Sequence, residues 1–305
     1  MTPAAQPTGG DLPPRARLAV GVVSAGRVGT ALGQALERAG HLVVATSAVS
    51  TASRRRAVAR LPEAQILPPD EVAARSDLLL LAVPDDVLPG LVAGLVAAGS
   101  IRPGQIVCHT AGALGVAPLQ PAAGAGALPL AIHPAMTFTG REEDTARLES
   151  CCFGVTAADE AGWLVAESLV LEMRGEPVRV PESARTLYHA ALAHGANHLV
   201  TLVRDAVDAV HAACPQASAE RVLAPLLSAA LDSALRLGDQ GLTGPVARGD
   251  AATVGRHLGA LHDAPGLDPG IGDGYRALSR RTATRAAAAG LISAAAADDV
   301  RTVLS

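Results

Sequence analysis

The sequence predicts an α/β protein with an N-terminal Rossmann-like domain, a doubly wound and mostly parallel sheet, followed by an all-α C-terminal domain. Short apolar runs alternate with helical patterns up to residue 180, which is typical of parallel strands covered by helices on both faces. After Pro181, helical patterns follow one another without a strand signal. The length of 305 residues also favours two domains.

The Rossmann-like domain is expected to span residues 17–180, after a Pro-rich 1–16 tail that is expected to be disordered. Its strands are continuous apolar runs, which indicate burial on both faces of a sheet. They are expected at 18–23, 42–45, 78–83, 106–109, 130–133, 153–156 and 178–180. Helices are expected between them at 26–39, 85–98 and 159–174.

The helical C-terminal domain is expected to span residues 181–305. Ser183 is expected to cap a long helix that runs to Ala213. The next helix is expected to kink at Pro225, because proline lacks the N–H that the helix needs. Asp250 is expected to cap a third helix.

Composition excludes several function classes. The chain has 25 basic and 29 acidic residues, a net charge of −4 and 2% aromatics, so it offers neither the basic surface nor the stacking platforms of a nucleic-acid-binding protein. All 25 basic residues are arginine, which excludes a lysine Schiff base, a Walker A lysine and a lysine general acid. Prolines interrupt the longest uncharged stretch, so no membrane helix is predicted.

Cysteine usage bears on the compartment. The four cysteines are Cys108, Cys151, Cys152 and Cys214. They form no CxxC motif and no cluster with zinc-ligand spacing, so no metal is expected. Reduced thiols and the lack of a signal-peptide pattern before the first apolar stretch indicate a cytoplasmic protein.

A glycine-rich turn joins the first expected strand to the first expected helix. Its residues are Ser24, Ala25, Gly26, Arg27, Val28 and Gly29, which match the dinucleotide fingerprint except that serine replaces the first glycine. Gly26 would let the backbone approach a pyrophosphate, and Gly29 would let the helix pack closely on the strand. The helix N-terminus adds free N–H groups and a positive dipole end. The other interpretation is an ordinary strand-to-helix turn.

The second expected strand ends without the Asp or Glu that binds the ribose 2′-hydroxyl in NAD sites. Hydroxyl and guanidinium side chains follow it instead, namely Ser47, Ser53, Arg54 and Arg55. These groups suit a 2′-phosphate, so the expected cofactor is NADP(H). Alternatively, the arginines form the solvated start of a basic helix.

Several motifs carry a family resemblance. GVVSAGRVG, LLLLAVPDD, HTAG and AIHPAMTF, with YHAALAHGANHLV and LTGPVARGD further on, resemble NADP oxidoreductases that pair a Rossmann-like domain with a helical domain of unknown function. This family is similar to pyrroline-5-carboxylate reductases, prephenate dehydrogenases and 6-phosphogluconate dehydrogenases. The resemblance covers most of residues 17–280 and implies a homodimer built through the helical domain, which would also bind substrate.

The resemblance also implies roles for individual residues. Val83, Pro84 and Asp85 would line the nicotinamide end of the cofactor. In the polar turn after the fifth strand of the fold, His109 would face the cofactor and Thr110 the substrate. The helix lysine that hydroxyacid dehydrogenases and ketopantoate reductases use as an acid is absent, so their mechanism does not transfer.

His133 ends a predicted strand, at the edge where ligands of open α/β sheets bind. Histidine is suited to proton transfer near neutral pH, although a polar residue can simply end a strand. Arg248, in a Gly/Pro-rich loop, is suited to hold a substrate carboxylate, or else it is a solvated loop arginine.

The long helix after Pro181 offers further polar residues. His194, Asn197 and His198 share a face by their spacing, and His189 flanks the same side two turns earlier. We expect His189 to donate a proton and Asn197 to bind the substrate carbonyl or hydroxyl, with His194 and His133 beside them. The alternative is that this stripe faces water or a second copy of the chain.

We therefore expect a cytoplasmic NADP-dependent oxidoreductase that moves hydride between NADP(H) and a small carbonyl, imine or hydroxy compound at an interdomain cleft. One alternative is a non-catalytic NADP-binding sensor or scaffold, since a Rossmann domain shows binding and not turnover. The other is a ketopantoate-type reductase. NADPH consumption with keto acids, imines and aldehydes distinguishes these hypotheses.

Overall fold

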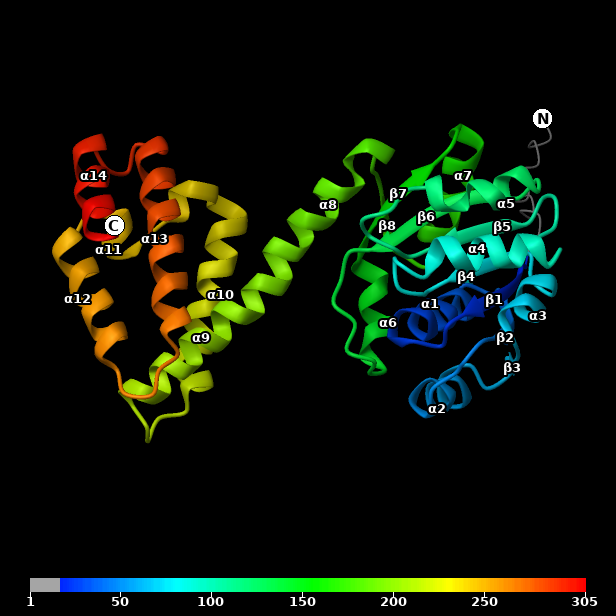
Figure 1. The fold of residues 1–305 in the computed structure, drawn as a ribbon, viewed down its shortest axis with the longest axis horizontal. Helices are drawn as coiled ribbons and strands as arrows, with labels where there is room; N and C mark the ends of the chain where they lie inside the picture. The colour runs from blue at the N-terminus through cyan, green and yellow to red at the C-terminus, as the bar shows by residue number, and fades with distance from the viewer. Residues whose placement is uncertain (1–16) are drawn as a thin grey trace, which may run out of the picture. The chain divides into compact units, whose positions relative to one another are not determined.

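The computed structural model describes residues 17–305, and the tail expected at 1–16 lies outside the described residues. The chain divides into two compact units, Met1–Ala193 and His194–Ser305. Among the described residues, every strand belongs to the first unit and the second unit is helical (Figure 1). The predicted fold class is confirmed. The domain boundary expected near residue 181 stays a prediction, and the compact units divide later, within the long helix.

An eight-stranded sheet forms the centre of the first unit. Its strands are β1 (Ala19–Val23), β2 (Leu42–Thr46), β3 (Gln65–Ile66), β4 (Leu78–Leu81), β5 (Ile106–His109), β6 (Leu128–Pro134), β7 (Cys152–Ala157) and β8 (Glu176–Arg179). Their order is β3-β2-β1-β4-β5-β6-β7-β8, with β7 antiparallel to β6 and all other pairs parallel. Strand order reverses between β1 and β4, and doubly wound sheets bind ligands at such a switch point.

Helices cover both faces of this sheet (Figure 1). The helices of this unit are α1 (Arg27–Arg38), α2 (Thr51–Arg60), α3 (Pro69–Ala74), α4 (Leu88–Ala97), α5 (Gln120–Gly124), α6 (Glu143–Arg147), α7 (Glu160–Glu172) and α8 (Arg185–Leu192), with 3₁₀ turns η1 (Ala117–Leu119), η2 (Leu148–Ser150) and η3 (Glu182–Ala184). In β4, Leu78 and Leu80 join the core beneath α1 and α7, whereas Leu79 and Leu81 join the core beneath α3 and α4. This alternation explains why the strand is a continuous apolar run.

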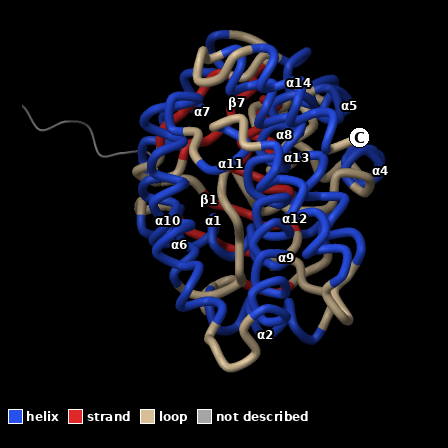
Figure 2. The backbone as a smooth tube through the Cα atoms, turned by 90° about the vertical axis from the view of Figure 1, so that its left-hand side faces the viewer, coloured by secondary structure: helices blue, strands red, loops and turns tan. Residues whose placement is uncertain are grey.

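The second unit contains only helices among its described residues (Figure 2). They are α9 (His198–Ala213), α10 (Ala219–Leu237), η5 (Gly238–Gly241), α11 (Gly244–Ala247), α12 (Ala251–Asp263), α13 (Pro269–Ala288) and α14 (Ala294–Val303). The expected cap of α12 is confirmed, because Asp250 accepts a hydrogen bond from the backbone N–H of Thr253. Pro225 lies inside α10.

The long helix expected from Ser183 to Ala213 needs two corrections. Ser183 does not cap it, because η3 forms first and Ala184 precedes α8 without a side-chain cap. A π-helix, Ala193–Asn197, then separates α8 from α9. A π-helix bonds residues five apart rather than four, so the α-helical spacing expected between His189 and Asn197 does not hold.

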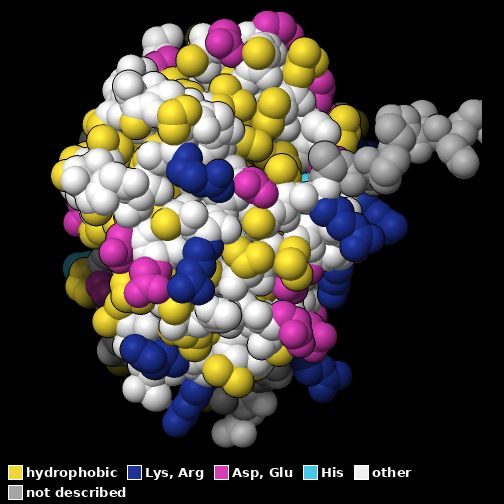
Figure 3. All heavy atoms as spheres, turned by 90° about the vertical axis from the view of Figure 1, so that its right-hand side faces the viewer, with side chains coloured by type: hydrophobic (Ala, Val, Ile, Leu, Met, Phe, Trp, Pro, Cys, Tyr) yellow, Lys and Arg dark blue, Asp and Glu magenta, His cyan; other side chains and the backbone are white. Residues whose placement is uncertain are grey.

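The surface of the first unit mixes charges of both signs. On the face drawn in Figure 3, basic and acidic side chains lie among one another and among hydrophobic ones. Within residues 17–305, no helix has the length and apolar character needed to cross a membrane.

Candidate functional site

The glycine-rich turn is fixed to the end of β2. Ser24 has a φ of +79°, a left-handed conformation that glycine adopts most easily, and it stands where the fingerprint usually has glycine. Its backbone N–H donates to Ser47 Oγ at 2.9 Å, and the N–H of Ala25 donates to the Ser47 carbonyl at 2.8 Å. These two bonds stabilise the unusual backbone. Ser47, expected at the cofactor, thereby also shapes the turn.

The two glycines of the turn face different surroundings. A Cβ atom at Gly26 would meet only Ser24 Oγ, at 3.5 Å, so the space in front of this residue is open. A Cβ atom at Gly29 would lie 2.3 Å from the Ser24 carbonyl oxygen. Gly29 therefore permits close packing. Gly26 leaves room where α1 presents N–H groups without partners inside the helix, an arrangement that fits a pyrophosphate.

The start of α2 carries the expected 2′-phosphate residues. Ser53 is buried, and its hydroxyl donates to the Ser50 carbonyl at 2.8 Å, so it serves the N-terminal cap of this helix. Arg54 and Arg55 are exposed near the start of the helix. Arg56 Nε donates to the Ala25 carbonyl at 3.3 Å and ties α2 to the glycine-rich turn. Two exposed guanidinium groups near a helix N-terminus suit a phosphate dianion.

Two other groups of expected cofactor residues lie close to the glycine-rich turn. One group follows β4, at the same edge of the sheet, and the other begins α1. Val83 follows β4 and is half-buried, and Pro84 and Asp85 after it are exposed. Arg27 Nη1 lies 3.4 Å from the Phe138 carbonyl oxygen, and Val28 is half-buried in the first turn of α1.

His109 shapes a turn rather than projecting from the sheet. Its ring is fully buried, Nε2 lies 2.7 Å from the Gly115 carbonyl, and Nδ1 accepts the N–H of Ala111 at 3.1 Å. This pattern places the proton on Nε2. Burial lowers the pKa of His109 to about 4, so the ring is neutral at physiological pH. Both nitrogens are committed, and its expected contact with the cofactor stays a prediction, as does that of the half-buried Thr110 with substrate.

His133, at the end of β6, lies beside two residues of α8. Its Nδ1 is 3.2 Å from the Tyr188 hydroxyl, and its ring meets the His189 ring edge to face with centroids 5.9 Å apart. All three side chains are half-buried. The structure thus brings together His133 and His189, two of the expected catalytic residues, and adds Tyr188.

Side chains from η3 and α8 occupy the space that a side chain would fill at three glycines of the first unit, and these contacts hold η3 and α8 in place. A Cβ atom at Gly115 would overlap the Glu182 carboxylate, one at Gly154 would lie 2.6 Å from the Tyr188 hydroxyl, and one at Gly112 would lie 2.5 Å from His189 Cδ2. We call Gly112, Gly115 and Gly154 the glycine notches. They hold α8 in one register, which determines where its histidine and tyrosine lie.

Arg185 lies beneath this cluster. Only 1% of it is exposed, and its Nε donates to Thr156 Oγ1 at 2.7 Å, while Nη2 donates to the carbonyls of Ala131 and Gly154. Its Nη1 is buried without a hydrogen-bond partner. Among residues 17–305, no carboxylate lies within ion-pair distance of this guanidinium. A buried cation without a counter-charge is costly, which suggests that it serves function.

The remaining expected residues belong to the second unit. Asn197 is exposed in the π-helix, and His194 Nδ1 lies 3.0 Å from His198 Nδ1. Arg248 is exposed directly after α11. Their expected roles stay predictions.

Sequence reasoning missed Tyr188 and Arg185. Tyr188 directly precedes His189 in the motif YHAALAHGANHLV. The motif therefore contains this residue, but nothing in the sequence indicates which side chain it contacts. Arg185 carried no signal, because arginine is usually exposed and hydropathy gives no reason to bury it.

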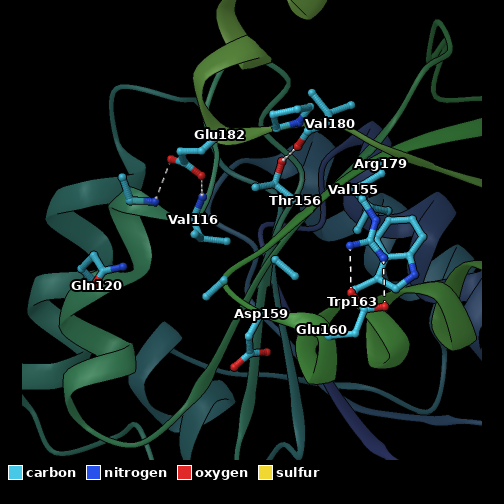
Figure 4. Close-up of a pocket in the computed structure, with 14 residues that line it drawn as sticks. Val116, Gln120, Val155, Thr156, Asp159, Glu160, Trp163, Arg179, Val180 and Glu182 are labelled. Atoms are coloured by element: carbon cyan, nitrogen blue, oxygen red, sulfur yellow. Dashed lines mark hydrogen bonds and ion pairs between the residues drawn. The ribbon is translucent and has the colours of Figure 1, made fainter.

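The first unit also holds a cavity of about 610 Å³ between β7, β8, the start of α7 and η1 (Figure 4). Its charged groups already have partners within the unit. Glu182 accepts the N–H groups of Val116 and Ala117, and Glu160 pairs with Arg179, which stacks on Trp163. None of the residues expected at the site lines this cavity.

Comparisons with known proteins identify two domains. Residues 4–134 match the model of a Rossmann-like domain, and residues 151–282 match the model of a domain of unknown function, DUF2520. The second match begins within the sheet, just before β7. No curated protein matches the chain.

Solved structures share the fold over most of the chain. A protein of Bacteroides fragilis assigned as an NADP oxidoreductase is 21% identical with a TM-score of 0.72, over 87% of this chain and 98% of that one. An imine reductase from Pseudomonas sp. is 18% identical with a TM-score of 0.66, over 90% and 99%. A reductive aminase from Aspergillus terreus, solved with NADPH and ethyl-5-oxohexanoate, is 17% identical with a TM-score of 0.64, over 88% and 94%. The chain therefore pairs a Rossmann-like domain with a DUF2520 domain, as does the family that its sequence resembles, and it shares the fold of these reductases.

Proposed function

We propose that this protein is an NADP-dependent oxidoreductase that acts on a small carbonyl, imine or hydroxy compound. The observation that carries the proposal is a shared sheet edge. The glycine-rich turn follows β1, and His133 ends β6, so both lie at the carboxyl end of parallel strands. A dinucleotide turn and a group of proton-carrying side chains at one edge are what hydride transfer needs.

NADP(H) fits the residues present. Gly26 and the N-terminus of α1 would hold the pyrophosphate, and Arg54 and Arg55 would hold the 2′-phosphate. When bound, the cofactor supplies or accepts hydride at its nicotinamide ring. The fold likeness to proteins solved with NADP or NADPH supports this assignment.

Turnover of NADPH tests the function. We expect the full chain to consume NADPH with at least one member of a panel of ketones, 2-oxo acids, aldehydes and cyclic imines, followed by the loss of absorbance at 340 nm. The Gly26→Val variant is the matched control for background NADPH oxidation, because its side chain fills the proposed cofactor site. Tight NADPH binding without turnover on the whole panel would instead favour a sensor.

Cofactor preference follows from the charges on α2. We expect NADPH to bind at least tenfold more tightly than NADH, a difference of about 1.4 kcal/mol. Arg54→Ala or Arg55→Ala should narrow this difference, whereas Arg102→Ala should leave it unchanged, because Arg102 lies before β5 at the opposite edge of the sheet. Calorimetry measures all of these affinities. Equal affinities for the two cofactors in the unmodified protein would contradict the assignment.

A second copy of the chain is the proposed partner of the helical unit. Many large apolar side chains of α9 and α10 are exposed, which is unusual for a surface that faces only water. They are Leu199, Val200, Leu202, Val222, Leu226, Leu231, Leu235 and Leu237. Covering them in a homodimer would remove this apolar area from water.

The proposed compartment is the cytoplasm. All four cysteines are free thiols, which is typical of proteins in a reducing compartment.

A further inference from the structure

The contact between Tyr188 and His133 fixes where the imidazole carries its proton. Nδ1 of His133 lies 3.2 Å from the Tyr188 hydroxyl, and a neutral phenol donates its hydrogen to an imidazole nitrogen that has none. The ring proton of His133 is then on Nε2. This nitrogen would lie 2.9 Å from a Cβ atom at Gly112, so any side chain at that position would lie against it.

The groups that face His133 are neutral or positive. From α8 they are Arg185, Tyr188 and His189, and from β5 there is His109, whose ring is neutral. The guanidinium carbon of Arg185 lies 5.9 Å from the centre of the Tyr188 ring. Glu182 is the acidic residue that acts on Arg185, but its carboxylate is bound to backbone N–H groups of η1 and its preceding residue. The cluster therefore lies in a positive field.

Burial keeps both side chains uncharged, and the positive field adds to this effect at His133. Burial, with His189 and Arg185, lowers the pKa of His133 to about 4. Burial also raises the pKa of Tyr188, whereas the charge of Arg185 acts in the opposite direction. Below pH 4 the ring of His133 takes up a proton, and above that pH it is a neutral donor. At neutral pH both side chains therefore carry a hydrogen that they can donate without a charge of their own.

We propose that His133 donates its Nε2 hydrogen to the oxygen of a carbonyl substrate, that Tyr188 and Arg185 position and support this donor, and that the site favours carbonyl compounds over cationic imines. This inference rests on the proposed oxidoreductase function and specifies its substrate class. Reduction of a carbonyl places negative charge on oxygen, which a neutral donor and a nearby cation stabilise. A protonated imine brings a positive charge into the same field, which repels it.

The proton balance follows the same three groups. Bound NADPH would supply a hydride to the carbonyl carbon, and the electron pair of the C=O π bond would move to oxygen. The oxygen takes the Nε2 proton of His133, while Nδ1 takes the proton of Tyr188. The resulting phenolate is stabilised by Arg185, and the product is an alcohol. After the product leaves, Nε2 takes a proton from water and Nδ1 returns its proton to the phenolate, which restores the starting donor.

The tautomer of His133 tests the positioning roles without turnover. In the full chain labelled with ¹⁵N-histidine, with His133 assigned by His133→Gln, we expect a neutral ring protonated at Nε2 from pH 5 to 8. Tyr188→Phe should mix the two tautomers. Tyr275→Phe is the matched control, because Tyr275 forms the other tyrosine–histidine contact, 2.8 Å from His257.

Arg185→Gln should raise the pKa of His133. A wild-type ring that titrates near 6.5 or carries its proton on Nδ1 would overturn the proposal, and this result does not depend on any variant folding.

Paired substrates test the substrate class. We expect NADPH oxidation with a cyclic ketone at a kcat/KM at least tenfold above that with an N-methylated cyclic iminium of the same ring size. Arg185→Gln should reduce this ratio, and Tyr188→Phe should lower kcat for the ketone with little change in NADPH affinity. Faster reduction of the iminium would overturn the inference while leaving the oxidoreductase function in place. Oxidation with neither substrate nor any panel member would overturn the proposed function itself.

Discussion

Alanine in place of Gly29 is expected to destabilise the first unit by more than about 3 kcal/mol. The new Cβ atom would lie 2.3 Å from the Ser24 carbonyl oxygen and 3.1 Å from side-chain atoms of Val22 and Ala82. The carbonyl cannot move easily, because Ser24 and Ala25 are bonded to Ser47. Inserting one methyl into a packed region already costs about 1–3 kcal/mol, and here the obstacle is backbone. Urea denaturation followed by circular dichroism measures the change.

Gly33→Ala is the control for this substitution. Gly33 lies one turn later in α1, and its Cβ atom would meet the ends of the Leu61 side chain at 3.0 Å and 3.3 Å, which are side-chain atoms rather than backbone. We expect a small change of stability there. Similar denaturation midpoints for the two variants would show that the tight packing around Gly29 does not limit the fold.

Valine in place of Gly26 is expected to weaken NADPH binding by at least about 100-fold, or 2.8 kcal/mol, while the protein stays folded. Gly26 has φ −74° and ψ −171°, an extended conformation that a β-branched residue adopts readily. The Cβ atom would meet only Ser24 Oγ within 4 Å, so the valine side chain would extend into the open space that the pyrophosphate needs. Calorimetry measures the affinity, and circular dichroism the fold.

Gly94→Val serves as the control, because Gly94 in α4 also has open space around its Cβ position and lies outside the turn. It should bind NADPH as the unmodified protein does. Unchanged affinity in Gly26→Val would place the cofactor elsewhere in the molecule.

Much of the fold was predictable because its signals are local. The apolar run Leu78–Leu81 predicts a strand buried on both faces, and the glycine-rich turn follows β1 as the fingerprint requires. β3 was missed because Gln65 and Ile66 alone cannot form an apolar run, and the six-residue α3 is too short for a helical period. The π-helix was also missed, since nothing in residue spacing distinguishes it from an α-helix.

The candidate site was only partly predictable. Residues at the ends of strands, such as His133, follow from the direction of the sheet. The contact of His133 with Tyr188 joins residues 55 positions apart and depends on the antiparallel pairing of β7 with β6 and on the docking of α8. No spacing rule contains that information. Arg185 reaches its three acceptors through the same docking.

The glycine notches determine where this chain can be divided or recombined. Because Glu182, Tyr188 and His189 fill them, the segment up to Leu192 belongs with the sheet even though it follows the last strand. A break after residue 180 would leave three hollows on the sheet and remove the buried guanidinium that binds the carbonyls of Ala131 and Gly154. A chimeric protein that joins this sheet to a different helical domain would therefore have to keep α8 with the sheet. Its junction would have to lie beyond Leu192, in the π-helix.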